Sequence, residues 1–280
     1  MHFGVEIPPF ECFKKGKIKM SEKIVFEKVD VTKKGNHSVE LCIGDIPHAR
    51  PFHHTIEKGS FIEFKGNVGY YHILILIEGK AKFTTDGKEF TFDERTTFVP
   101  SPECDLKVEA ESDLQILEIQ WDTLPSDVDD LKEYKTEFPV VVPYKDSIQY
   151  IDPNKSEKTI SRMMIPQRII PRFSIGSVES YGYDLVRPHT HPMLDQFFFS
   201  FPENNMNLII NDEKIQMLGN LIYHIPLGAN HGVEVTDDNH MHYMWIDFMF
   251  DENGLKRLDA SHKPTGLNRS FEEERKNMNK

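Results

Sequence analysis

The sequence predicts an all-β protein made of two copies of one β unit. Its apolar and aromatic runs are short and are separated by turn signals, as in a sandwich or barrel of many short strands. Several features of the first half recur in the second half at a nearly constant distance. With 280 residues, of which 39% are hydrophobic and 28% charged, the chain is globular and long enough for two domains with separate cores.

The clearest β-hairpin of the first half centres on Asp86-Gly87. The flanking residues 82–90 alternate between polar and apolar side chains, and an Asp-Gly pair favours a tight turn between antiparallel strands. A similar hairpin spans residues 208–217 in the second half, where Asp212 lies 126 residues after Asp86. The sequence therefore predicts a second copy of this hairpin.

The end of each predicted copy is also repeated. Pro226 follows a short apolar strand and lies 126 residues after Pro100, which follows a similar strand. Each copy then closes with a β-like stretch that contains a tryptophan, Trp121 or Trp245. Several features at nearly one spacing indicate an internal repeat. We therefore expect an N-terminal barrel over residues 1–121, a linker over 122–158, a C-terminal barrel over 159–262 and a polar tail over 263–280.

The charge and cysteine content exclude several classes of protein. A formal net charge of −12 argues against a nucleic-acid partner, which requires a basic surface. Three cysteines, Cys12, Cys42 and Cys104, are too few and too scattered for a disulfide framework. The N-terminal residues lack the apolar core of a signal peptide, and no apolar run reaches the ~18 residues of a membrane helix. We therefore expect a cytoplasmic protein without a membrane partner.

The second half carries a histidine pattern that the first half lacks. His189 and His191 are separated by one residue, Gln196 follows five residues later, and the sequence PLGANH ends at His231. Because successive side chains of a strand point to opposite faces, the first two histidines share a face. Neutral imidazole is the commonest protein ligand of metals and suits Zn, Fe, Cu and Ni. These four side chains can therefore converge on one metal ion inside a small barrel.

An H-x-H triplet alone is weak support for a metal site. The chain contains 13 histidines and has a second triplet, His240-Met241-His242, so one such match arises easily by chance. The alternative is that the histidines are polar residues of a barrel interior. The surrounding turns favour a metal site, because Gly219 precedes a short strand and a Pro-x-Gly turn then presents the last histidine.

The motif residues resemble the two conserved motifs of the cupin superfamily. RPHTHPMLDQ resembles the first motif and PLGANH the second, so the resemblance spans residues 187–231, and only the turn-and-strand skeleton matches in the first half. The resemblance implies two tandem cupin-type β-barrels, also called jelly rolls or double-stranded β-helices. It further implies one divalent metal ion (Fe, Mn, Zn or Ni) in the C-terminal barrel, held by His189, His191, Gln196 and His231.

Two departures from the family pattern bear on the metal site. Gln196 stands where most cupins have glutamate, and the interval from Gly219 to Pro226 is one residue longer than usual. Three imidazoles and an amide leave the full charge of a divalent ion uncompensated, so we expect an anionic, chelating substrate. At the repeat distance the first half has Glu63, Lys65, Tyr70 and Asp105 instead, which predicts a metal-free barrel with a structural or interface role.

Five further residues are candidates for substrate binding or catalysis. Arg187 precedes the histidines by two residues, so in a regular strand it would share their face and bind a substrate carboxylate. Tyr183 has the same parity, and Phe198 shares the face of the glutamine and would line the pocket. His224 and His242 lie on nearby strands and are candidate general bases, unless their strands turn these side chains out of the barrel.

Together these features predict a metal-dependent enzyme that acts on a small oxygenated anion. The first hypothesis is an Fe(II)-dependent dioxygenase. The second is a non-oxidative isomerase, decarboxylase or lyase in which a divalent metal polarises a sugar or keto acid. The third is a binding or sensor module without catalysis. The resemblance also allows a homodimer, since exposed barrel edges often pair in this superfamily.

Overall fold

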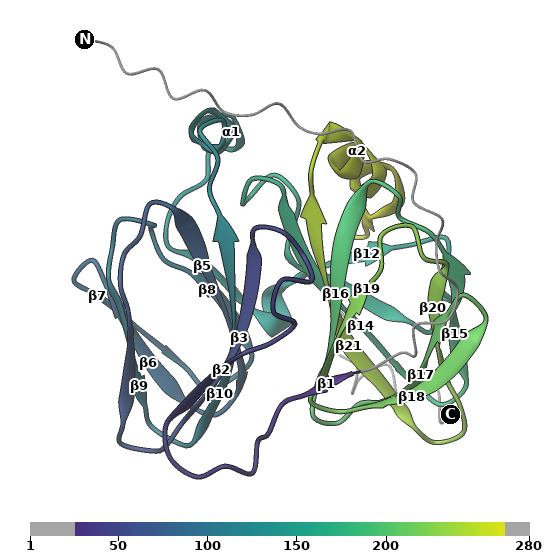
Figure 1. Cartoon of the computed structure of the whole chain (residues 1–280), viewed down its shortest axis with the longest axis horizontal. Coiled ribbons are helices and arrows are strands. Elements are labelled where there is room, and N and C mark those ends of the chain that lie inside the picture. Colours follow the sequence, from purple (N-terminus) through teal and green to yellow (C-terminus); the bar gives the residue numbers. More distant parts are fainter. Residues whose placement is uncertain (1–25, 267–280) are drawn as a thin grey trace.

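The computed structural model describes residues 26–266, which form two β-barrels that lie side by side (Figure 1). Each barrel consists of one large and one small antiparallel sheet. In the N-terminal barrel the strands of the large sheet are, in spatial order, β11 (Val140–Pro143), β8 (Thr96–Val99), β5 (Tyr70–Glu78), β10 (Leu114–Asp122), β3 (Ala49–Ile56) and β2 (His37–Glu40). Those of its small sheet are β4 (Phe61–Phe64), β9 (Leu106–Ala110), β6 (Ala81–Thr85) and β7 (Lys88–Phe92).

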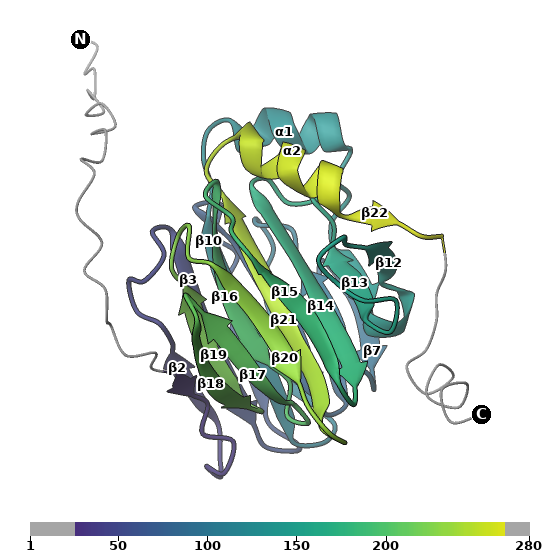
Figure 2. The ribbon, with the colours of Figure 1, turned by 90° about the vertical axis from the view of Figure 1, so that its right-hand side faces the viewer.

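The C-terminal barrel repeats this arrangement. The strands of its large sheet are β1 (Glu27–Lys28), β19 (Leu221–Ile225), β16 (Leu194–Ser200), β21 (His240–Met249), β14 (Phe173–Tyr181), β13 (Ile160–Ile165), β12 (Ile148–Ile151) and β22 (Lys263–Pro264). Those of its small sheet are β15 (Asp184–His189), β20 (His231–Val235), β17 (Asn205–Ile210) and β18 (Glu213–Leu218). The helices α1 (Asp127–Tyr134) and α2 (Glu252–Ser261) both lie at one end of the barrels (Figure 2).

The spatial order of the strands confirms the predicted all-β fold. The large sheets contain the equivalent series β8-β5-β10-β3 and β19-β16-β21-β14, and the small sheets contain β4-β9-β6-β7 and β15-β20-β17-β18. Within the two small sheets, the predicted hairpins form the β6–β7 and β17–β18 pairs. The repeat seen in the sequence is therefore a repeat of the structure.

Short strands from outside the predicted range of each barrel add to its sheets. β1, from the predicted N-terminal domain, pairs with β19 of the C-terminal barrel. β11, from the predicted linker, extends the N-terminal barrel, whereas β12 from the same linker and β22 from the predicted tail extend the C-terminal one. These additions cover sheet edges whose backbone groups would otherwise lack partners. The remainder of the predicted tail, residues 267–280, lies outside the described residues.

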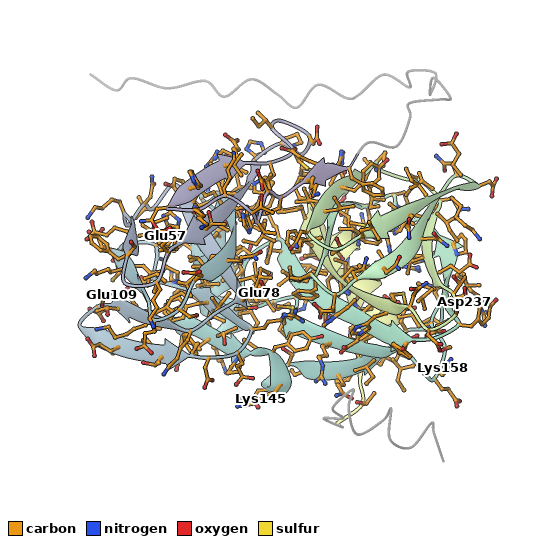
Figure 3. The ribbon with its side chains drawn as sticks, turned by 90° about the horizontal axis from the view of Figure 1, so that it is seen from below. Glu57, Glu78, Glu109, Lys145, Lys158 and Asp237 are labelled. Carbon is orange, nitrogen blue, oxygen red and sulfur yellow. The ribbon has the colours of Figure 1, made fainter. Side chains whose placement is uncertain are left out.

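The two barrels share one hydrophobic core between their large sheets. On β21, Met244, Ile246 and Phe248 face the N-terminal barrel and pack in a cluster that includes Trp121 of β10. The alternate residues of β21 face the interior of their own barrel instead. Seen from below, Lys145 in the 3-10 turn η1 (Tyr144–Asp146) lies at the junction, with Glu109 and Asp237 at opposite ends (Figure 3).

The interior of the N-terminal barrel contains a buried His–Glu–His cluster. Glu118 Oε2 accepts a hydrogen bond from His54 Nε2 at 2.8 Å, and Glu118 Oε1 lies 2.5 Å from His72 Nδ1. None of the three residues is more than 4% exposed. Burial alone would raise the pKa of Glu118, but the hydrogen bonds from both histidines lower it to about 2. The cluster links β3, β5 and β10 through one ionised carboxylate.

The residues at the repeat distance from the predicted metal ligands are not members of this cluster, although the Tyr70 ring packs against His72 with the ring centroids 4.9 Å apart. Lys65 Nζ forms exposed ion pairs with Asp105 at 2.9 Å and with Glu63 at 3.5 Å.

Of the described helices, neither has the length and apolar composition needed to cross a membrane. The described cysteines, Cys42 and Cys104, are free thiols.

Candidate metal centre

Three histidines meet in the C-terminal barrel. His189 ends β15, His191 follows in the next loop, and His231 begins β20 directly opposite His189 in the strand register. One ring nitrogen from each lies within 4.8 Å of the others. The ring centroids are 4.7 to 5.3 Å apart. Such separations suit three imidazoles that each reach one metal ion over about 2.0–2.1 Å.

Backbone carbonyls orient two of these rings. His189 Nδ1 donates to the carbonyl of Arg187 at 2.7 Å, and His231 Nδ1 donates to that of Ala229 at 3.1 Å. A carbonyl only accepts, so in each ring the proton is on Nδ1 and Nε2 keeps its lone pair. Metal-binding histidines commonly have a hydrogen bond of this kind behind them.

Burial keeps the three imidazoles neutral. It lowers the pKa of His191 to about 2 and that of His231 to about 4, and it also lowers the pKa of His189. Metal binding requires deprotonated ring nitrogens, so these side chains need not release a proton at neutral pH before they bind an ion.

Gln196 lies in the same cavity and is fixed by a buried carboxylate. Its Nε2 donates to Asp247 Oδ1 at 2.6 Å, across the β16–β21 pair. Its Oε1 is buried and has no hydrogen-bond partner among the described residues. An orphaned buried oxygen costs free energy unless something binds it. This oxygen beside three neutral imidazoles fits a divalent metal ion.

Asp247 was not predicted as part of the site. Burial raises its pKa to about 7, although the hydrogen bond from Gln196 and the charge of Lys155 oppose this shift. It lies beside Phe248 on β21 and belongs to no recognisable sequence motif. Its role in the structure is to hold the amide so that the carbonyl oxygen is the atom left free.

Several other residues that line the cavity come from segments without a recognisable sequence motif. The cavity has a volume of about 30 Å³, and its lining residues include the three histidines, Gln196, Phe198, Tyr243, Trp245, Asp152, Lys155 and His262. Lys155 Nζ donates to the hydroxyl of Tyr150 at 2.7 Å and lies 3.4 Å from Asp152 Oδ2. Burial lowers the pKa of Lys155, whereas Asp152 raises it. The lining of the cavity therefore includes a buried lysine as well as the three histidines.

The strand that carries the first histidine is irregular, and this moves Arg187 out of the cavity. The register of β15 against β20 shifts between Val186 and His189, as at a β-bulge. Both of these residues line the cavity, whereas Arg187 is exposed and its backbone N–H donates to the carbonyl of Asn154. The prediction that Arg187 binds substrate assumed a regular strand and is not supported by this placement.

The two candidate general bases also lie outside the cavity. His224 pairs with Phe197 in the strand register, and its Nε2 is 2.9 Å from Asp195 Oδ1. His242 projects between the barrels, where its Nε2 is 2.8 Å from the Tyr144 hydroxyl. The inward faces of their strands are taken by larger apolar residues, so both histidines point away from the metal ligands.

The remaining two candidates differ in their placement. Tyr183 lies in the turn before β15, at the opposite end of that strand from His189, and is 66% exposed. Phe198 lines the cavity, with its ring centroid 5.7 Å from that of His231. Of the five further candidates, only Phe198 lies beside the three histidines in the structure.

Comparison with known proteins identifies the fold but not a close relative. Neither a protein-family model nor a curated protein matches the sequence. Among solved structures, a cupin 2 conserved barrel domain protein from Leptotrichia buccalis is 13% identical with a TM-score of 0.53, covering 78% of this chain and 92% of its own. An IolB-like protein from Salmonella typhimurium is 11% identical with a TM-score of 0.61, covering 82% and 94%. A variant of Bacillus subtilis oxalate decarboxylase is 11% identical with a TM-score of 0.57, covering 78% and 76%.

These similarities extend over both barrels and confirm the predicted cupin fold. At 11 to 13% identity they show the fold alone. The chemistry of the site therefore has to be argued from the side chains of this chain.

Proposed function

We propose that this two-barrel cupin is a metal-dependent enzyme that acts on a small oxygenated anion held between the metal ion and Lys155. One observation carries the proposal: three neutral imidazoles and the orphaned oxygen of Gln196 line one cavity that also contains a buried amine. His189, His191, His231 and Gln196 would hold the ion. A divalent metal bound there supplies a Lewis acid with open positions for the substrate.

The charge of the site favours an anionic substrate. The four proposed ligands are neutral, so they do not offset the charge of a divalent ion. Of the two acids that line the cavity, Asp247 contacts the amide nitrogen of Gln196 rather than its free oxygen, and Asp152 pairs with Lys155 at 3.4 Å. In a buried site with a low effective dielectric constant, an anion would gain mainly from the charge of the metal ion and also from the ammonium form of Lys155, whose charge Asp152 partly offsets.

The position of Lys155 is well fixed. Tyr150 accepts its hydrogen bond and in turn accepts one from Trp245 Nε1 at 2.9 Å. The neighbouring Asn154 anchors the loop to β15 through its backbone carbonyl. A cavity of about 30 Å³ holds one or two water molecules, so it fits a ligand of only a few atoms unless the entrance opens.

Two reaction classes suit this arrangement. A dioxygenase, the first hypothesis, would use the open metal positions for substrate and molecular oxygen. The second, a non-oxidative isomerase, decarboxylase or lyase, is favoured by two proton-carrying groups in the cavity, Lys155 and Asp247. Oxygen consumption during turnover distinguishes the two, and ligand binding without turnover would support a sensor module. The homodimer implied by the resemblance stays a prediction.

Replacing Lys155 with methionine is expected to weaken binding of a small carboxylate by about 100-fold, because loss of a buried charge partner costs about 2–5 kcal/mol. Methionine keeps the length of the side chain and removes the amine. We expect the metal content to stay unchanged. Calorimetric titration of metal-loaded protein with oxalate and with pyruvate measures the effect.

Lys158→Met is the matched control for this substitution. Lys158 is exposed, and its amine contacts only the carbonyl of Tyr183 among the described hydrogen bonds. It should bind both anions as the unchanged protein does. Equal affinity of the Lys155→Met and Lys158→Met proteins would show that Lys155 does not hold the substrate.

A further inference from the structure

A second histidine pair lies at the junction between the barrels. His240 and His242 project from the same face of β21, and their stacked rings have centroids 5.5 Å apart. Glu179, on the neighbouring strand β14, is opposite His242 in the register. Its Oε1 is 3.1 Å from His240 Nε2 and 3.6 Å from His242 Nδ1. This is the second H-x-H triplet of the sequence, which the proposed function leaves unused.

We propose that His240, His242 and Glu179 bind a second divalent metal ion, of the zinc type, between the two barrels. Their three ligand atoms lie within 4.8 Å of one another. Tetrahedral zinc with nitrogen and oxygen ligands at about 2.0–2.1 Å has ligand atoms about 3.3 Å apart. The distances of 3.1 and 3.6 Å from Glu179 bracket that value.

The neighbours of His242 fix its ring in an orientation that suits metal binding. Its Nε2 is 2.8 Å from the Tyr144 hydroxyl, which is also 2.8 Å from Ser177 Oγ. When Nε2 donates to Tyr144 and Tyr144 donates to Ser177, Nδ1 carries a lone pair, with Glu203 Oε1 at 2.6 Å and Glu179 Oε1 at 3.6 Å. Hydrogen bonds of this kind behind a ligand histidine set its tautomer. His242 is 2% exposed and Glu179 7%, so two of the three ligands are already shielded from water.

Two carboxylates and the guanidinium groups of Arg95 and Arg162 surround the cluster. Glu203 also lies close, with Oε1 2.6 Å from His242 Nδ1. Arg95 of the N-terminal barrel forms two hydrogen bonds of 2.7 Å with both oxygens of Glu203 and so neutralises it. Without an ion, the neutral ring of His242 donates its Nδ1 proton to Glu203 and its Nε2 accepts from the Tyr144 hydroxyl. Binding of an ion at Nδ1 would shift the ring proton to Nε2, which then donates to Tyr144 while the Tyr144 hydroxyl donates to Ser177.

This site is separate from the barrel centre. On β21 the residues Tyr243 and Trp245 line the cavity of the barrel, whereas His242 faces the other barrel. An ion held by Glu179 and the two histidines would join β14 to β21 on the face that meets the N-terminal barrel. We therefore expect this ion to have a structural role. Its binding should not require a metal ion at the three histidines of the C-terminal barrel.

Zinc stoichiometry tests the proposal. Protein stripped of metal, loaded with zinc chloride and desalted should retain two zinc ions per chain by mass spectrometry. Glu179→Leu, which keeps the bulk of the side chain and removes both oxygens, should retain one, as should His191→Ala; the double variant should retain none. His224→Ala, at a histidine outside both clusters, should retain two.

The outcomes separate this proposal from the proposed function. One ion in the unchanged protein that is lost in His191→Ala and kept in Glu179→Leu would overturn the second site and leave the barrel centre standing. One ion that is kept in His191→Ala and lost in Glu179→Leu would do the reverse. If Glu179→Leu does not fold, His240→Ala at a partly exposed position serves instead: retention of both ions there overturns the proposal.

Discussion

Replacement of His191 by alanine is expected to weaken metal binding in the C-terminal barrel by more than 100-fold and to abolish turnover. Changing a residue that only supports a ligand already costs about 10–100-fold in affinity, and His191 is a proposed ligand itself. The half-buried, neutral ring of His191 forms a triangle with those of His189 and His231, so its loss leaves only two of the three imidazoles. Competition with a chelating dye measures the affinity.

The thermal stability of the variant gives a second measure. At a free metal concentration of about 100 times the dissociation constant, binding stabilises the native state by about 2.7 kcal/mol. A chelator should therefore lower the melting temperature of the unchanged protein more than that of His191→Ala. Thr190→Ala, at the exposed residue beside His191, is the control and should behave like the unchanged protein. If His191→Ala and Thr190→Ala bind the metal equally well, His191 is not a ligand.

Replacement of Glu118 by leucine is expected to destabilise the protein by about 3–5 kcal/mol, the usual cost of removing one partner of a buried ion pair. Leucine leaves the Glu118-facing nitrogens of His54 and His72 buried without a partner. Glu118→Gln is the control, because an amide can accept from His54 and donate to His72. It should cost only about 1 kcal/mol, the net value of an ordinary hydrogen bond. Urea unfolding measures both, and equal losses would show that the cluster is not a source of stability.

The effect of Glu118 should depend on pH. Its pKa is about 2 in the folded protein against an ordinary value of 4.5, so the folded state favours the ionised carboxylate. The resulting stabilisation is present above pH 4.5 and is lost as the pH falls toward 2. We therefore expect the difference between the unchanged protein and Glu118→Leu to shrink over that range. A difference that stays constant from pH 7 to about 2.5 would contradict this role.

The sequence predicts the repeated barrels because the repeat involves strong local signals. The turn at Asp86-Gly87 and its counterpart near Asp212 fix equivalent hairpins, and strand alternation separates inner from outer faces. The short edge strands were not predictable in the same way. β1 and β22 contain two residues each, and they form because open sheet edges of the C-terminal barrel are available to them.

The residues of the candidate site also differ in how far the sequence predicts their positions. The histidines and Gln196 belong to motifs whose spacing is local, and the structure brings them together. Strand alternation predicted that Arg187 shares the face of the histidines. A β-bulge shifts the register of β15 between Val186 and His189 and leaves Arg187 outside the cavity. Parity also cannot say which face of β21 is inward, and this left the direction of His242 open. Lys155 comes from the predicted linker, and only the fold places it in the cavity.

The central claim is that a metal ion is bound by three histidines and an amide oxygen in the C-terminal barrel. Anomalous X-ray scattering from crystals of metal-loaded protein, collected at the absorption edge of that metal, tests it most directly. We expect a peak about 2.0–2.2 Å from one nitrogen of each histidine and from the oxygen of the glutamine, namely His189, His191, His231 and Gln196. The absence of a peak there, with Gln196 Oε1 bound to another group, would contradict the claim.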